Sequence, residues 1–385
     1  MAASKDQIMR EAVELAKKAR GQTAPNPMVG AIVLSKDGEV LGTGYHVKAG
    51  APHAEVVAIR QALEKGADLK DATLFVTLEP CNHFGKTPPC TDLILSSGIK
   101  KVYFGAIDPN PLMRGKSGER LRSQGVQVES GLLMDDCEKL IRGFRSVVDK
   151  KRPFVTLKCA TSLDGKIATS AGESQWITDE PARQMGHVER SEHDAILVGV
   201  GTVLADDPQL TVRDSDLRNS EGTRPIRKVV LDSQLRTPPT AKIFASRDQV
   251  LIYCGWNYSE DRKKVLENAG AVVIPLSSPN AEKFSQETLG LKNVLEDLAL
   301  RGVQEILVEG GARVMGTFVK EKLFDRIIYF IAPKILGSES RDVFEGLQVA
   351  TLKESIGLEN LTTRLVGKDV VIEGVIEGIR ECSPA

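Results

Sequence analysis

The first 150 residues combine one helical stripe with several short apolar runs. Between residues 5 and 20 the apolar side chains recur every three or four positions, which predicts an amphipathic helix. The stripe consists of Ile8, Ala12, Val13, Ala16 and Ala19. Pro25 and Pro27 follow soon afterwards, and proline cannot continue the hydrogen bonding of a helix.

The apolar runs that follow indicate strands separated by helices. We expect strands at residues 29–34, 39–45, 73–78 and 101–106, and helices at 53–63, 91–97 and 135–150. Lys36-Asp37-Gly38 provides a hairpin turn between the first two strands. This order predicts an α/β fold, with hairpin and crossover segments in one sheet of an α/β/α layer domain.

A charged stretch ended by proline, Lys150-Lys151-Arg152-Pro153, suggests a domain boundary. We therefore expect one domain over residues 1–149 and a second over residues 150–385. Beyond the boundary the alternation restarts, with strands at 154–160, 194–200, 226–232, 249–253, 271–275 and 305–309 and helices at 179–192, 259–269 and 291–301. Two further strands, at 325–332 and 369–376, are expected to close the sheet of a second α/β domain.

Length and charge restrict the function classes. A chain of 385 residues exceeds one ordinary core and favours two domains. Its formal net charge of -1, without a long basic run, is a poor match for a nucleic-acid binder. Neither a membrane-spanning apolar stretch nor an apolar signal core is present, so we expect a cytoplasmic protein without a membrane partner.

The cysteines indicate a metal site more readily than a disulfide framework. Of the 6 cysteines, Cys137, Cys159, Cys254 and Cys382 each stand alone. Cys81 and Cys90 are close together in a segment that also contains His83. In a reducing compartment such a pair is typical of metal binding.

His53 and Glu55 complete a donor set for a catalytic zinc ion. Zinc favours thiolate and imidazole ligands, and His53, Cys81 and Cys90 supply three, leaving one tetrahedral position open for water. Glu55 could carry the proton of that water to a departing amine, as in nucleobase deaminases with H-x-E and P-C-x-x-C signatures. Here eight residues, not two, separate the cysteines.

Both parts of this motif, the histidine and the pair of cysteines, also have a purely structural interpretation. His53 could simply begin a helix, and Cys81 and Cys90 could be small buried residues of the core. If His83 were a fourth ligand, the site would be closed and structural; because Glu55 favours an open site, we interpret His83 as a pocket residue.

The first domain resembles the pyrimidine deaminase of riboflavin biosynthesis. The resemblance rests on TAPNPMVG at 23–30, GYH at 44–46, GAPHAE at 50–55, TLEPCNHFGKTPPC at 77–90 and DPNP at 108–111. It implies zinc on His53, Cys81 and Cys90, with Glu55 as general acid and base. The substrate pocket that it implies is formed by Asn26, His46, His83, Lys86, Asp108 and Asn110. Lys86 would suit the substrate phosphate, although a solvated loop lysine is the plain alternative.

The second domain contains two glycine-rich turns that could receive a nucleotide. Gly310-Gly311 follows an apolar strand and precedes a helix at 314–320, so backbone amides could approach a phosphate there. A tight strand-to-helix turn is an equally good interpretation, and the same holds for the turn at Gly199-Val200-Gly201. Trp176 could be a core aromatic or a stacking surface for a ring.

This half is similar to the reductase part of the bifunctional riboflavin-biosynthesis enzyme. The similarity covers KCATSLDGKIA at 158–168, GESQWIT at 172–178, DAILVGVGTVLADDP at 194–208, LDS at 231–233 and VEGG at 308–311. It implies a dihydrofolate-reductase-like α/β fold that binds NADPH. The cofactor residues that it implies are Ala160, Trp176, Thr202, Asp206, Gly311, Ala312, Arg313, Val314, Met315, Gly316 and Thr317. The substrate residues that it implies are Ser174, Arg190, Leu210, Arg213 and Glu309.

Hydride transfer belongs to the cofactor, so the protein has to supply orientation and electrostatics. We expect Asp206 and Lys158 to assist ring opening or protonation near the reacting sugar carbon. The resemblance as a whole implies deamination of 2,5-diamino-6-(5-phosphoribosylamino)pyrimidin-4(3H)-one, followed by NADPH-dependent reduction of the ribosyl group. It also implies a homo-oligomer, a dimer or a tetramer. Two alternatives remain: a deaminase with a silent reductase-like half, and a zinc-stabilised nucleic-acid binder, which the charge disfavours.

Overall fold

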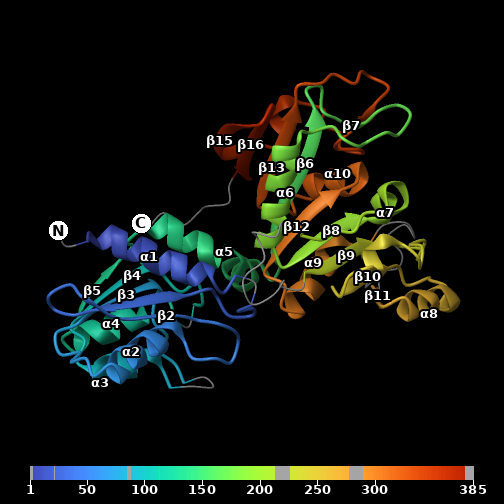
Figure 1. The fold of residues 1–385 in the computed structure, drawn as a ribbon. Helices are drawn as coiled ribbons and strands as arrows, with labels where there is room; N and C mark the ends of the chain where they lie inside the picture. Colours follow the sequence, from blue (N-terminus) through green and yellow to red (C-terminus); the bar gives the residue numbers. More distant parts are fainter. Residues whose placement is uncertain are drawn as a thin grey trace. The chain divides into compact units, whose positions relative to one another are not determined.

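A computed structural model describes residues 3–20, 22–84, 88–111, 113–212, 226–276 and 289–377 (Figure 1). The chain divides into two compact units, Met1–Lys151 and Arg152–Ala385, each with a sheet of its own. Among the described residues, no helix combines the length and the apolar character needed to cross a membrane.

The first unit is an α/β/α layer, as the sequence predicts. Its five strands lie in the order β2-β1-β3-β4-β5. They are β1 (Gly30–Leu34), β2 (Val40–Tyr45), β3 (Thr73–Leu78), β4 (Lys101–Ala106) and β5 (Gln127–Ser130). The β1–β2 hairpin and the β1–β3 pair are antiparallel, whereas β3, β4 and β5 are parallel.

Side chains of β1 alternate between two apolar layers, because successive residues of a strand point to opposite faces. Ala31 and Val33 pack in the cluster that contains helix α2, whereas Ile32 and Leu34 pack in the cluster that contains α1. The helices of this unit are α1 (Lys5–Lys17), α2 (Ala54–Glu64), α3 (Cys90–Ser97), α4 (Lys116–Ser123) and α5 (Met134–Lys150).

The second unit is built on a nine-stranded sheet in the order β11-β10-β9-β8-β12-β6-β13-β16-β15. Neighbouring strands from β11 to β13 are parallel, and β16 and β15 are antiparallel additions. The strands are β6 (Phe154–Ser162), β8 (Ala195–Gly199), β9 (Arg227–Leu231), β10 (Val250–Cys254), β11 (Ala271–Pro275), β12 (Glu305–Gly310), β13 (Arg326–Ala332), β15 (Leu358–Val366) and β16 (Asp369–Ile376). A separate pair is formed by β7 (Lys166–Ala168) and β14 (Arg341–Asp342).

Helices cover this sheet through the same alternation. Leu197 of β8 joins the cluster that contains α9 and α10, whereas Ile196 and Val198 join a cluster on the other face that contains α7 and α8. The helices are α6 (Glu180–Glu192), α7 (Val200–Asp206), α8 (Glu260–Asn268), α9 (Leu291–Leu300) and α10 (Ala312–Lys320), with 3-10 turns at Lys242–Phe244 and Leu352–Glu354.

The structure corrects the predicted position of one strand and adds elements that the pattern missed. The strand predicted at 325–332, β13, does not close the sheet but lies between β6 and β16, and β15 forms the edge. The Gly199–Gly201 segment is not only a turn, because Gly199 caps helix α7. Elements α4, β5, β7, β14 and β15 were not predicted.

Candidate functional site

The first site forms where the parallel strands β3 and β4 end, at one edge of the first sheet. Cys81 follows β3, and Asp108 and Asn110 follow β4. His53 is the N-cap residue of α2, and Cys90 is the first residue of α3. Two helix starts and two strand ends therefore bring these side chains together, which is the usual place for a site in an open α/β sheet.

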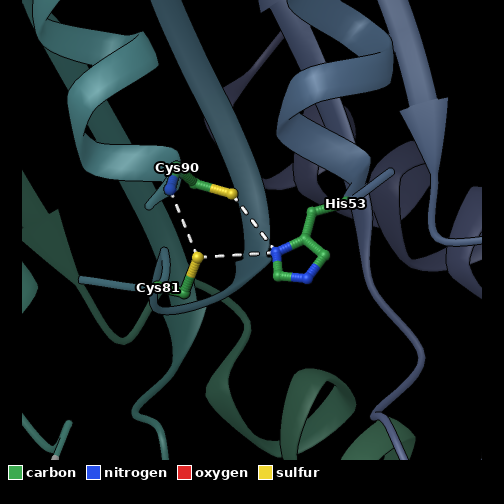
Figure 2. A group of neighbouring side chains, drawn as sticks. All are labelled: His53, Cys81 and Cys90. Carbon is green, nitrogen blue, oxygen red and sulfur yellow. Dashed lines mark hydrogen bonds between the residues drawn. The ribbon is translucent and has the colours of Figure 1, made fainter. Parts of the chain in front are cut away.

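The three predicted metal ligands converge on one point (Figure 2). His53 Nδ1 lies 3.5 Å from Cys81 Sγ and 3.3 Å from Cys90 Sγ. The backbone N–H of Cys90 donates to Cys81 Sγ over 3.2 Å. All three donor atoms lie within 4.8 Å of one another, and the metal-ligating group found among the described residues consists of these three alone.

This donor set fits a catalytic zinc ion. One imidazole nitrogen and two sulfurs would supply three ligands to a zinc ion and leave a fourth position for water. The hydrogen bond between the two cysteines lowers the pKa of the Cys81 thiol, although burial opposes its ionisation, and the same bond raises the pKa of the Cys90 thiol. A thiol that ionises readily is suited to metal binding, because zinc binds the thiolate. His83 is exposed and lies outside the group, which agrees with its interpretation as a pocket residue.

Glu55 lies in the first turn of α2, two residues after His53, and only 4% of it is exposed. Burial, reinforced by the nearby Cys81 sulfur, raises the pKa of this carboxyl to about 7. A carboxyl with such a pKa can both accept and release a proton near neutrality. A pKa near neutrality thus suits Glu55 to the role of proton carrier predicted for it.

A cavity of about 440 Å³ opens beside these residues. Its lining includes the predicted residues Asn26, His46, His53, Glu55, Cys81, His83, Asp108 and Asn110. Lys86 lies outside the described residues. Burial raises the pKa of the Asp108 carboxyl, which accepts the backbone N–H of Asn110 over 2.9 Å.

His46 is held in one orientation by both ring nitrogens. Its Nδ1 lies 3.1 Å from the Pro52 carbonyl oxygen, and its Nε2 lies 3.0 Å from the Asn26 side-chain nitrogen. A carbonyl can only accept, so Nδ1 carries the proton, and Nε2 accepts from Asn26. Burial lowers the pKa of His46, which favours this neutral form. Asn26 and His46 are thereby fixed as a pair on the cavity wall.

Glu79 is a cavity residue that the sequence analysis missed. This buried carboxylate accepts backbone N–H groups from Asp108, Gly115 and Ser117 at 3.3, 2.9 and 3.1 Å. It thus ties the end of β3 to the loop that carries Asp108 and Asn110. The sequence did contain a signal for it. Glu79 directly follows a buried strand, and burying an unpaired charge there would cost free energy of folding, so it had to have partners.

The second site lies where the parallel strands β6, β8 and β12 end. Two hollows of about 570 and 480 Å³ share Lys158, Ala160, Ser174, Thr202, Asp206 and Glu309. The larger hollow also contains Gly311, Ala312, Arg313, Val314, Met315 and Thr317. The smaller also contains Trp176, Arg190 and Leu210. Arg213 lies outside the described residues.

The predicted cofactor segment begins at a glycine that its conformation requires. Gly311 has φ +62 and caps α10, and a Cβ there would lie 3.3 Å from Thr202 Oγ1. Such a backbone leaves room for a phosphate at the start of the helix. Gly316, another predicted cofactor residue, lines neither hollow. A Cβ at this position would come within 2.2 Å of the Glu345 carbonyl oxygen, so this glycine allows α10 to pack closely against that backbone.

Several predicted substrate, cofactor and catalytic residues of this half make polar contacts. Arg190 Nε and Nη2 lie 2.6 and 2.7 Å from the two carboxylate oxygens of Glu309. Ser174 Oγ donates to Asp206 Oδ1 over 2.8 Å. Trp176 is 60% exposed and has the Arg183 guanidinium 4.6 Å from its ring, so it is a surface aromatic and not a core residue.

The comparisons with known proteins define the class of both halves. Residues 2–106 match the family described as the cytidine and deoxycytidylate deaminase zinc-binding region, and residues 153–372 match the RibD C-terminal domain. The fold and the donor set thus belong to a zinc-binding deaminase domain joined to a reductase domain.

Curated relatives match over almost the whole chain. The riboflavin biosynthesis protein RibD of Aquifex aeolicus (strain VF5) is 43% identical over 94% of this chain and 96% of its own length. That of Escherichia coli (strain K12) is 37% identical over 94% of this chain and 97% of its own length. The chain belongs to the RibD family of riboflavin biosynthesis proteins.

Solved structures agree with this assignment and with the predicted fold. Acinetobacter baumannii RibD is similar with a TM-score of 0.82 and 35% identity, covering 96% of this chain and 98% of its own. A diaminohydroxyphosphoribosylaminopyrimidine deaminase/5-amino-6-(5-phosphoribosylamino)uracil reductase from Thermotoga maritima has a TM-score of 0.80 and 37% identity with the same coverage. The resemblance noted in the sequence is therefore confirmed.

Proposed function

We propose that this chain catalyses two steps of riboflavin synthesis. The first unit hydrolytically removes an amine from 2,5-diamino-6-(5-phosphoribosylamino)pyrimidin-4(3H)-one. The second unit reduces the ribosyl group of 5-amino-6-(5-phosphoribosylamino)uracil to ribityl with NADPH. The observation that carries the proposal is the convergence of His53, Cys81 and Cys90 within 4.8 Å beside the buried Glu55.

In the first unit, His53, Cys81 and Cys90 would hold zinc, which when bound supplies an activated water. Glu55 takes the proton of the attacking water and passes it to the departing amine, for which a pKa of about 7 is well placed. Asn26 and His46, locked together, present fixed polar edges to the pyrimidine, together with His83, Asp108 and Asn110. Lys86 would meet the substrate phosphate.

In the second unit, NADPH would lie in the larger hollow and supply the hydride. Its phosphates would meet the start of α10 at Gly311, with the residues from Ala312 to Thr317, Ala160 and Thr202 around the cofactor. Trp176 would reach the cofactor from the smaller hollow. Gly316 would contribute through the packing of α10.

The substrate would lie in the smaller hollow, against Ser174, Arg190, Leu210 and Glu309. The resemblance adds Arg213, which lies outside the described residues, as a further substrate residue. Asp206, oriented by Ser174, would assist ring opening or proton transfer at the sugar carbon together with Lys158. Both residues line both hollows, where the cofactor and the substrate would meet.

A deaminase with a silent reductase half has less support. The RibD C-terminal domain family matches residues 153–372, and both hollows are lined by residues that the resemblance assigns to cofactor and substrate.

We further propose a cytoplasmic location, where thiolates stay reduced, and a homo-oligomer. The exposed Leu361 and Leu365 on the edge strand β15 support self-association, and sedimentation of the purified protein tests it.

The test measures ammonia release and NADPH oxidation separately, on wild type and on Glu55→Gln. The variant should retain zinc and reduce the deaminated substrate at the wild-type rate, while ammonia release falls by roughly 10²–10⁴-fold. A Glu55→Gln protein that still deaminates would refute the role of Glu55. A wild type that oxidises no NADPH would refute the second activity.

A further inference from the structure

One arginine of the first unit contacts the residues that directly follow both cysteine ligands. Arg120 on α4 donates to Asn82 Oδ1 over 2.7 Å and to Thr91 Oγ1 over 3.0 Å. Its Nη2 also lies 2.6 Å from Asp92 Oδ1. Asn82 follows Cys81, and Thr91 follows Cys90. A single guanidinium therefore bridges the two ends of the segment that separates the cysteines.

The two ends are also joined directly. Thr91 Oγ1 donates to Asn82 Oδ1 over 3.0 Å, and the backbone N–H of Thr91 donates to the Cys81 carbonyl oxygen over 3.2 Å. Thr91 is completely buried, so its own side of these bonds is shielded from water. With Arg120 the bonds form one network beside the two cysteines.

The spacing of the cysteines explains why such a network is useful. In the short P-C-x-x-C form the chain itself keeps two cysteines close, whereas here eight residues intervene. Closing a longer loop costs more conformational entropy. Arg120 offsets that cost before any metal binds, because its planar fork fixes several acceptors at once.

We propose that Arg120 is a positioning residue of the zinc centre, which holds Cys81 and Cys90 at the separation that the metal requires. The proposal rests on the proposed function of this site as a zinc-dependent deaminase. Arg120 itself contributes no metal ligand. Its effect passes through Asn82 and Thr91, as expected for groups that orient ligands from behind.

An ordinary surface ion pair is the competing interpretation. The Arg120 and Asp92 side chains are 39% and 37% exposed, and such a pair on its own contributes little. If Arg120 acted only through Asp92, its loss would slightly weaken the packing of α3 and α4 and leave the metal unaffected. Zinc affinity therefore separates the two interpretations.

The experiment measures zinc affinity of the full-length protein by competition with a chromogenic zinc chelator. Arg120→Ala should bind zinc roughly 10–100-fold more weakly than wild type. Arg120→Lys keeps the charge but not the fork and should also bind more weakly. The matched control is Arg122→Ala on the same helix, whose guanidinium donates to the Val128 carbonyl oxygen over 3.3 Å. This variant should bind zinc like wild type.

The circular dichroism spectrum of each variant reports whether the first unit is folded, and NADPH-dependent reduction reports whether the second unit is intact. If Arg120→Ala fails to fold, Arg120→Lys decides the question in its place. A folded Arg120 variant with wild-type zinc affinity would overturn the proposal. Failure of the zinc assignment itself would be recognised differently, because wild type and Cys81→Ser would then bind zinc equally or not at all.

Discussion

Arg190 and Glu309 form a bidentate ion pair between helix α6 and the end of strand β12, with N–O distances of 2.6 and 2.7 Å. Both side chains are largely buried, and Arg190 also donates to the Thr211 carbonyl over 3.0 Å. Burial alone would raise the pKa of Glu309, but Arg190 outweighs it and lowers the pKa to about 2. The pair lies on the wall of the smaller hollow.

Removing one partner of this pair should destabilise the second unit. Arg190→Ala leaves the buried Glu309 carboxylate without its bidentate partner, and the loss of one partner of a buried ion pair costs roughly 3–5 kcal/mol. Replacing both, by Arg190→Met with Glu309→Leu, should recover much of that loss. Both tryptophans, Trp176 and Trp256, lie in the second unit, so tryptophan fluorescence during urea unfolding measures its stability. Equal stability of Arg190→Ala and wild type would contradict this account.

The same pair predicts a pH dependence. Glu309 has a folded pKa of about 2, below its ordinary value of 4.5, so the unfolded chain binds the proton first as pH falls. The pair's contribution is therefore fully present above about pH 4.5 and is lost as pH falls through about 2. The difference in unfolding free energy between wild type and Glu309→Gln should shrink over that window. A constant difference would be incompatible with ionisation of Glu309.

Zinc removal should separate the two activities. Dialysis against dipicolinate should reduce ammonia release to background, because His53, Cys81 and Cys90 would no longer hold the metal that activates water. NADPH oxidation with the deaminated substrate should be unchanged, since the second site contains none of these ligands. Added zinc should restore ammonia release. Loss of both activities on chelation would mean that the metal also supports the second unit.

Asp206→Asn tests the acid–base role in the reductase half. The amide can still accept from Ser174 Oγ but cannot carry a proton, so reductive turnover should fall by roughly 10²-fold or more. Ammonia release should not change. Asp207→Asn is a suitable control, because Asp207 accepts the Lys242 backbone N–H in a structural contact. Unchanged reduction in Asp206→Asn would exclude the role.

The elements that sequence reasoning located are those with a buried apolar face. Strands β3, β4, β11 and β16 have the predicted bounds, because apolar runs end where burial ends. Strand β15 was missed since it lies at the sheet edge and most of its residues are exposed, so no alternation marks it. Helix α4 has only Leu121 as a large buried side chain, and its N-cap residue is Gly115, so its sequence signal is weak.

The zinc ligands could be predicted because an imidazole, a carboxylate and two cysteines, in that order along the chain, have few other uses together. Glu79 and Arg120 could not, because their partners lie 28–38 residues away and only folding brings them together. The ion pair between Arg190 and Glu309 was not predicted either, since each residue was assigned to the substrate on its own. Long-range polar pairs leave no periodic signal.

The position of β6 has a consequence for synthesis on the ribosome. Its two neighbours, β12 and β13, begin at Glu305 and Arg326, about 150 and 170 residues after β6 begins. The buried ion pair between Arg152 and Asp325 likewise cannot form until Asp325, 173 residues downstream, has been synthesised. The strand pairs of the first unit all lie within residues 30–130, so that unit can complete its sheet while the second is still being translated. The zinc centre can thus be assembled before the nucleotide site exists.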